Sequence, residues 1–527
     1  MIHRTGPSIG TDPLVERMMM VHFRGGFRTI MSATTVVVVA VGLAFGTTSV
    51  LLSPDHLVGS QSRAEAAPNP PGVGLSDGGG LLWATDAELD TTVQFVTAMG
   101  VKSMRIAIPW STVEPTQNQL NWAPVDRVVN KLRAANISML GIIAYTPAWA
   151  TSPVNQPINT RPASPAAFGT FAGKVAARYK GKVADYEIWN EPNGAMFYAP
   201  EPDPAGYTAL LKAAYPKIKA ADSAATVVGG VLGAAEQAWG IINPVDFTNQ
   251  MYAAGAAGYF DALSYHPYQY SLKFSEGPYV DHSPARQVMD MRTAMVANGD
   301  GSKKIWATEY GVPTSVASED QQSAMITDFV TKWRELPYTG PIFLYQLRDK
   351  QTGSNDPEMT FGLLRTDWSA KPALWALMSL LQNNIPRTAE YNRFAAAPNN
   401  FGAVLGPVFP VRDTWAQYRQ DAVVYEMPNG FVGVPRAVAE AVRYTGFLPT
   451  TPFNGTYQDF DSPYGLRVFS TAIGGTHNIG GGIFSAWDPT LGPATSDEVP
   501  QYGGGVRVTF QYGAITWAPW VGTTVTR

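Results

Sequence analysis

Two glutamates, Glu191 and Glu309, each follow a short β-rich run, and these two residues could work as a pair. Glu191 belongs to Trp189-Asn190-Glu191-Pro192, and Glu309 lies 118 residues later in Thr308-Glu309-Tyr310-Gly311. A lone Asn-Glu-Pro is more often an ordinary polar turn. Two facing carboxyl groups can cleave a glycosidic bond, because one protonates the leaving oxygen and the other acts from the opposite side of the anomeric carbon.

The elements that must position this pair are short apolar runs that alternate with helical patterns. The predicted strands lie near 72–83 and at 101–108, 138–144, 182–189, 226–232, 260–265, 303–308 and 341–347. Predicted helices include 86–99, 123–135, 164–179, 204–221 and 319–335. Buried strands that alternate with helices form a parallel sheet with helices outside it. Eight such units over residues 72 to about 385 predict an α/β fold, a (β/α)8 TIM barrel, with both glutamates at the C-terminal rim of its strands.

An open doubly wound sheet is the alternative fold, and a serine hydrolase is the alternative chemistry. The doubly wound sheet would need a glycine fingerprint for phosphate after its first strand, and no Gly-x-Gly-x-x-Gly follows there. Residues 74–78 match Gly-x-Ser-x-Gly, but a nucleophile elbow needs a strand directly before it and a helix directly after. A proline-rich linker precedes this segment and glycines follow it, so we expect a loop after, or leading into, strand 1.

The two glutamate motifs, on predicted strands 4 and 7, resemble those of the retaining glycoside hydrolases of clan A, particularly families 5 and 39. The resemblance covers residues 72 to about 385 and implies acid/base catalysis by Glu191 and nucleophilic attack by Glu309, through a covalent glycosyl-enzyme. It calls for no metal or organic cofactor. Clan members cut β-glucosides, β-mannosides, β-xylosides and α-L-arabinofuranosides on one catalytic frame, so the fold does not choose a substrate.

Polar residues on neighbouring strands are expected to support the pair. Arg105, on predicted strand 2, would hold Glu309 charged, although a buried arginine could instead pair with Asp185 or Glu187. The resemblance implies that Asn190 hydrogen-bonds the sugar 2-hydroxyl. His266-Pro267-Tyr268 is similar to the clan's His-x-Tyr element, so Tyr268 would donate to Glu309 and His266 would line the sugar site.

Aromatic residues near the same rim could bind sugar rings. Trp110 follows strand 2, and Tyr145 and Trp149 follow strand 3. Their flat faces suit sugar rings, and the alternative is that they belong to the core. The clan usually presents tryptophan at the end of strand 8, where this chain has Tyr345. We expect Tyr345 to take that place in the innermost sugar subsite.

The composition narrows the function classes. The chain has 527 residues, of which 15% are charged, against roughly 25% in an average soluble protein. Such a surface suits an envelope or extracellular protein. The net charge of −4, with no basic stripe, argues against nucleic acid as a partner. Cysteine is absent, which excludes disulfides and cysteine nucleophiles, and the six histidines do not favour a histidine-rich metal site.

Residues 1–67 read as an export signal or an N-terminal membrane anchor, followed by a linker. The apolar run 33–52 is preceded by Arg24 and Arg28, and Ala64-Glu65-Ala66 offers a cleavage site. The run is close to the ~20 residues that span a bilayer, so the anchor stays open. The catalytic barrel is expected to occupy residues 68–390.

The composition changes from about residue 399, where lysine vanishes and glycine, proline and aromatic residues rise. Leu405, Leu448 and Leu491 open similar motifs 43 residues apart, which indicates about three stacked repeats over 399–527. These resemble LGFP repeats of envelope proteins from mycolic-acid bacteria. The resemblance implies binding to the cell wall or its glycan, and the alternative is that the repeats only pack against the barrel.

Together these features predict a secreted or envelope-associated retaining glycosidase. Its substrate would be a polysaccharide, and the repeats favour envelope glycan such as arabinogalactan. The alternative is a wall protein whose barrel binds glycan without cutting it. The combination of Glu191, Glu309, Arg105, Asn190 and Tyr268 argues against that alternative, because binding alone does not need it.

Overall fold

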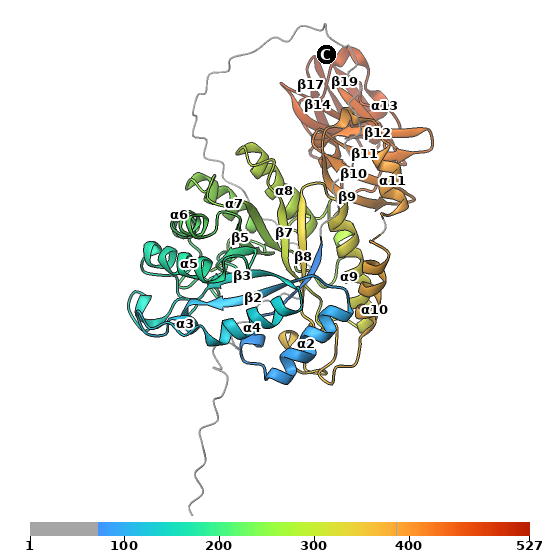
Figure 1. Ribbon diagram of the computed structural model, residues 1–527. Helices are drawn as coiled ribbons and strands as arrows, with labels where there is room; N and C mark the ends of the chain where they lie inside the picture. The colour runs from blue at the N-terminus through green and yellow to red at the C-terminus, as the bar shows by residue number, and fades with distance from the viewer. Residues whose placement is uncertain (1–71, 386) are drawn as a thin grey trace, which may run out of the picture. The chain divides into compact units, whose positions relative to one another are not determined.

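Eight parallel strands close into a barrel in the computed structural model, which describes residues 72–385 and 387–527 (Figure 1). The strands are β1 (Val73–Ser76), β2 (Ser103–Pro109), β3 (Ser138–Ala144), β4 (Asp185–Ile188), β5 (Thr226–Gly233), β6 (Ala262–His266), β7 (Ile305–Tyr310) and β8 (Thr339–Tyr345). Each pairs with the next, and β8 pairs with β1. The predicted (β/α)8 barrel is therefore confirmed. The predicted export signal or anchor, residues 1–67, lies outside the described residues.

Helices follow the strands and are started by recognisable signals. They are α2 (Asp86–Ala98), α3 (Trp110–Val113), α4 (Ala123–Ala134), α5 (Pro165–Tyr179), α6 (Pro204–Ala221), α7 (Pro244–Ala253), α8 (Pro284–Ala297), α9 (Glu319–Glu335), α10 (Pro372–Gln382) and α11 (Ala389–Ala395). Several begin with proline, whose fixed φ suits the first helical turn. The side chain of the preceding residue accepts a backbone hydrogen bond, as Ser283 does at α8.

Apolar side chains and the charged side chain of Arg105 both point into the barrel interior. Leu140, Val228, Ala262 and Phe343 pack together inside it. Gly74 on β1 makes room for them, because a Cβ there would lie 2.8 Å from the Phe343 ring. Arg105 stands opposite Ser76 and Leu140 in register, so its side chain also points inward. Segment 74–78 is thus largely strand β1 itself and not the loop that the sequence suggested.

The long connection from β8 to α10 is fixed by a buried ion pair. Lys371 donates to Asp349 at 2.8 Å, and both side chains are fully buried. Lys371 also donates to the carbonyl of Thr360, and Asp349 accepts from the backbone of Gly362. A buried charge is tolerated when it is paired and hydrogen-bonded in this way. The connection therefore presents its side chains to the rim in a defined position.

Three antiparallel sheets follow the barrel, consistent with a C-terminal domain. They comprise β9 (Val404–Val411), β10 (Thr414–Arg419), β11 (Ala422–Met427) and β12 (Gly430–Pro435); β13 (Tyr457–Phe460), β14 (Leu466–Thr471) and β15 (Gly475–Gly480); and β16 (Val499–Pro500), β17 (Val506–Phe510), β18 (Gly513–Ala518) and β19 (Gly522–Thr526). Helices α12 (Arg436–Val442) and α13 (Gly481–Ala486) follow the first two. The first sheet also packs on the barrel, because Met289 of α8 lies in its core and Arg286 pairs with Glu440.

Two of the spaced leucines lie at the joints between consecutive sheets. Leu448 packs with side chains of the first and second sheets, and Leu491 packs with side chains of the second and third. Leu405, by contrast, lies within strand β9, so its motif is not equivalent to the other two. The leucines spaced 43 residues apart therefore coincide with a joint at Leu448 and Leu491, but not at Leu405. Among the described residues, no helix has the length and apolar composition to span a membrane.

Leu491→Ala should loosen the last sheet without disturbing the barrel. Leu491 is fully buried, so the cavity should lower the free energy of unfolding of that joint by about 2–5 kcal/mol. Limited proteolysis of the full chain, followed by mass spectrometry, should show faster cleavage after residue 487 and unchanged barrel fragments. Val521→Ala, at an exposed valine, is the control. Equal cleavage in both variants would contradict the role of Leu491 as a joint.

Candidate active site

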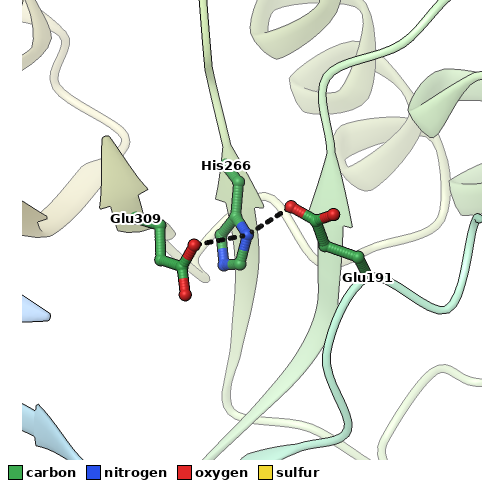
Figure 2. Close-up of side chains that lie close together, drawn as sticks. All are labelled: Glu191, His266 and Glu309. Carbon is green, nitrogen blue, oxygen red and sulfur yellow. Dashed lines mark hydrogen bonds and ion pairs between the residues drawn. The ribbon is translucent and has the colours of Figure 1, made fainter. Parts of the chain in front are cut away.

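The two glutamates meet at the C-terminal rim of the barrel, as Figure 2 shows. Glu309 lies near the end of β7, and Glu191 lies three residues beyond β4. One carboxylate oxygen of each and a ring nitrogen of His266 all lie within 4.8 Å of one another. Both glutamate side chains are largely buried, with 10% of Glu191 and 14% of Glu309 exposed. The site is therefore a pair of carboxyl groups held close together with little water around them.

Glu191 owes its position to an irregular backbone after β4. Trp189 and Glu191 both have positive φ, 71° and 42°, so the chain turns sharply at this point. The Glu191 amide donates to the carbonyl of Val231 on β5 at 2.9 Å, which fixes the turn. At the end of β5, a Cβ on Gly233 would come within 3.0 Å of the Glu191 carboxyl carbon. A side chain at position 233 would therefore displace the carboxyl group.

Arg105 connects the floor of the site to Glu309. Its Nε donates to Glu187 at 2.5 Å, one Nη contacts Glu309, and the other donates to the amide oxygen of Asn190 at 3.0 Å. Burial alone would lower the pKa of Arg105, but Glu187 and Glu309 together raise it, so the guanidinium stays charged. Of the three partners considered from the sequence, Glu309 and Glu187 contact Arg105, whereas no contact with Asp185 is seen among the described residues.

The Asn190 amide is oriented by this contact. A guanidinium can only donate, so the amide oxygen must face Arg105 and the amide nitrogen faces the other way. The nitrogen is then available to donate to a bound molecule. Asn190 immediately precedes Glu191, so a group that it binds would lie beside the carboxyl pair.

Tyr268 is the second donor to Glu309. Its hydroxyl donates to Glu309 Oε2 at 2.9 Å. Burial, and then the nearby Glu309 carboxylate, raise the pKa of Tyr268 well above its usual value. The hydroxyl therefore remains protonated over the whole working pH range. Arg105 and Tyr268 together satisfy both oxygens of an ionised Glu309.

His266 links Glu191 to a chain of hydroxyl groups. Its Nδ1 lies 2.8 Å from Glu191 Oε1, and its Nε2 lies 3.0 Å from the hydroxyl of Thr308, which in turn contacts Ser264. Thr308 can donate or accept, so both neutral tautomers of His266 are satisfied. His266 can therefore receive a hydrogen bond from a protonated Glu191 or donate one to an ionised Glu191.

Two carboxylates and an imidazole are also a donor set for divalent metals. At this site Arg105 contacts one oxygen of Glu309 and Tyr268 donates to the other. A cation on the cluster would lie close to the guanidinium charge, and it would have to displace one of these donors. The donor arrangement therefore favours a pair of carboxyl groups over a metal site.

Of the predicted aromatic residues, Tyr145 and Trp149 are half-buried, whereas Trp110 is fully buried. Tyr145 lies half-buried beside the pair, and burial, followed by the charge of Glu309, raises its pKa to about 12. Trp110 is only 1% exposed, stacks on Phe171 and donates to Glu114, so it belongs to the core and offers no free face to a sugar. Trp149 is half-buried and donates to the Glu114 carbonyl, with its ring edge against Trp110.

Tyr345 ends β8 and is 4% exposed. Its hydroxyl donates to Glu358 at 3.2 Å, and its ring packs edge-on against Phe361. Burial and the charges of Glu358 and Glu309 raise its pKa well above the usual value. Tyr345 is thus held beside Glu309 as a protonated hydroxyl.

Asp77, Lys350 and Glu358 were missed by the sequence reasoning. Burial raises the pKa of Glu358 to about 7, which Lys350 partly offsets. Burial likewise raises the pKa of Asp77 to about 6, although backbone hydrogen bonds from Leu81 and Gly79 oppose the rise. Both carboxyls lie near Tyr345, on the connections after β1 and β8. Asp77 lies within the first predicted strand region and Glu358 lies eleven residues after the last predicted strand, so no motif marked either carboxyl group.

Glu358→Gln should change how stability depends on pH. The pKa of about 7 in the folded protein is above the ordinary glutamate value of 4.5, so the neutral carboxyl favours folding and this contribution is lost as pH rises from 4.5 to 7. Relative to Glu358→Gln, the wild type should become less stable by roughly 3 kcal/mol between pH 4.5 and pH 8. Urea unfolding at several pH values measures the difference, with Glu201→Gln at an exposed glutamate as control. A difference that stays constant with pH would contradict the shift.

Comparisons with known proteins agree with the barrel fold. Residues 63–339 match the family model described as cellulase (glycosyl hydrolase family 5). A family 39 glycoside hydrolase from Bacteroides cellulosilyticus WH2 is similar in structure, with a TM-score of 0.52 and 19% identity, over 75% of this chain and 74% of that one.

Two further solved structures are similar at lower scores. A monomeric β-xylosidase from Caulobacter crescentus CB15 has a TM-score of 0.45 and 17% identity, over 68% of this chain and 74% of that one. A family 5 subfamily 18 protein from Streptomyces cattleya, in complex with GlcNAc, has a TM-score of 0.48 and 15% identity, over 61% and 82%. No curated protein matches the sequence significantly. Because the family model covers more than half of its 527 residues, the chain belongs to glycosyl hydrolase family 5.

Proposed function

We propose that this glycoside hydrolase is a retaining enzyme, with Glu309 as nucleophile and Glu191 as acid and base. The observation that carries the proposal is the close approach of the two carboxylates, whose nearest oxygens lie within 4.8 Å. A retaining pair stands ~5–5.5 Å apart, whereas an inverting pair needs ~6.5–9.5 Å to admit water between carboxyl and sugar. The different partners of the two groups support the division of roles.

In the first step an oxygen of Glu309 attacks the anomeric carbon. The bond from that carbon to the leaving oxygen breaks, and Glu191 transfers its proton to this oxygen. Arg105 and Tyr268 suit Glu309 to this role, because their donors favour its ionised form before attack. The Asn190 amide nitrogen is directed so that it could donate to a sugar hydroxyl next to the reacting carbon.

In the second step Glu191, now ionised, takes a proton from water. The water oxygen attacks the anomeric carbon from the side that the leaving group vacated, and the bond to Glu309 breaks. His266 suits both steps, since its Nδ1 can accept from the protonated form of Glu191 or donate to the ionised form. Two successive inversions retain the configuration of the sugar.

Removing each carboxyl group should have a different signature. Glu309→Ala should lose more than about a thousandfold in kcat on every substrate, because no bond to the sugar can form. Glu191→Ala should lose about 100–10,000-fold where the leaving group needs a proton, and far less on a dinitrophenyl glycoside, whose leaving group needs none. Azide should then speed Glu191→Ala and give a glycosyl azide of retained configuration.

The control for this pair is Glu201→Ala, at an exposed glutamate before α6, which should behave as the wild type. Product configuration is read by NMR at the anomeric proton. If azide instead rescued Glu309→Ala with retention, the two roles would be reversed. A wild-type product of inverted configuration would refute the double displacement.

We further propose that the substrate is an envelope polysaccharide such as arabinogalactan, and that the protein is exported, with the C-terminal sheets holding it at the wall. The sparsely charged surface supports this location. The last sheet also presents Tyr502 and Trp520, both fully exposed, on neighbouring turns at one end. Exposed aromatic rings of this kind suit the flat faces of sugars.

Hydrolysis of purified arabinogalactan by the full chain tests this substrate, beside β-glucan, mannan and xylan. We expect oligosaccharides to be released from arabinogalactan and expect Glu191→Gln and Glu309→Gln to abolish the release. Release from another glycan alone would replace the substrate and keep the mechanism. Tight binding to walls with no hydrolysis of any glycan would favour the alternative, a glycan-binding barrel.

A further inference from the structure

Trp239 lies on the loop between β5 and α7 and is 99% exposed. An indole that buries none of its surface contributes nothing to the hydrophobic core. The loop itself, residues 234–243, stands at the C-terminal end of β5, which is the catalytic rim of the barrel. Trp239 therefore presents a large apolar face to solvent near the site without serving the fold.

The tip that carries Trp239 is held in shape. Ala238 and Ile241 exchange two backbone hydrogen bonds, of 3.2 and 3.0 Å, so residues 239 and 240 form a two-residue turn. Gly240, the second residue of the turn, has a positive φ of 71°, which glycine adopts without steric cost. Gln287 from α8 donates to the Ala235 carbonyl at 2.7 Å and fixes the base of the loop. The exposed ring is thus mounted on an ordered support.

The same loop is tied to the segment that carries Glu191. The Ala195 amide donates to the carbonyl of Gly240 at 2.8 Å, and the Ile242 amide donates to Asn193 at 2.9 Å. The Asn193 side chain donates to the carbonyls of Gly233 and Ile242 and accepts from the Gly233 amide. Trp239 directly precedes Gly240, whose carbonyl is bonded to Ala195, four residues after Glu191. Trp239 therefore lies on the Glu191 side of the carboxyl pair.

That side has a defined chemical meaning. Glu191 gives its proton to the leaving oxygen, so the leaving group departs on the Glu191 side, while the sugar bonded to Glu309 stays on the other. We propose that Trp239 binds the ring of a leaving-group sugar by stacking on its apolar face. This inference rests on the proposed function and deepens it, because it makes the leaving group a saccharide and the substrate an oligosaccharide or a polymer.

Trp239→Ala tests this subsite with two classes of substrate. The probes are tetrasaccharides of β-linked glucose, mannose or xylose and arabinogalactan fragments, compared with nitrophenyl glycosides of the same sugars. For the saccharide that the wild type cuts, kcat/KM should fall about tenfold, mainly because KM rises. A tenfold change is the size expected when one buried apolar contact is lost. For the nitrophenyl glycoside, which places no sugar on that side, kcat/KM should change by less than about twofold.

Two variants complete the test. Trp239→Tyr keeps an aromatic face and should recover most of the saccharide activity. Trp375→Ala removes an indole that is 61% exposed on α10, a helix whose buried face is formed by Ala373, Leu374 and Leu377, and should leave both activities unchanged.

The outcomes separate the subsite from the function. An unchanged kcat/KM of Trp239→Ala on the saccharide, with an active wild type, would overturn the subsite alone. Equal losses on both substrate classes would also overturn it, because the residue would then act through the fold. A wild type that is inactive on every saccharide and glycoside would overturn the proposed function and this inference with it.

Discussion

One buried guanidinium sets the geometry on which the site depends. Arg105 is 2% exposed and is surrounded by Glu187 on β4, Asn190 in the turn after β4, and Glu309 on β7. Without the arginine, the Glu309 carboxyl group and the Asn190 amide would each lose a donor in a largely buried site. The position of Glu309 and the orientation of Asn190 thus have a common origin.

The rest of the rim differentiates two glutamates that are chemically identical. Arg105 and Tyr268 donate to Glu309, whereas His266 Nδ1, which can donate or accept, lies closer to Glu191, at 2.8 Å, than to Glu309, at 3.6 Å. The backbone turn after β4 and the absence of a side chain at Gly233 make room for the Glu191 carboxyl group. The asymmetry therefore comes from the neighbours of each carboxyl group and not from the groups themselves.

The sequence predicted the barrel well, because its strands are continuous apolar runs between clear helical patterns. Helices α7 and α8 were implied by the eight strand-helix units but were given no range from the sequence, although each opens with a capping residue followed by proline, as in Ser283-Pro284. Glu191 and Glu309 were found through two motifs that each follow an apolar predicted strand. Trp110 could not be assigned, since a core indole and a sugar platform look alike in sequence. Glu358 was missed because its raised pKa arises mainly from burial in the folded chain, which no local motif marks.

The leucine joints of the C-terminal sheets have a consequence for how this part of the chain can change. Leu448 and Leu491 each lie between two consecutive sheets, so each joint depends only on its immediate neighbours. A unit of sheet and joint can therefore be duplicated or deleted while the remaining joints stay intact. Duplication or deletion within the gene could lengthen or shorten the C-terminal domain by one unit at a time, and the catalytic barrel would need no compensating change.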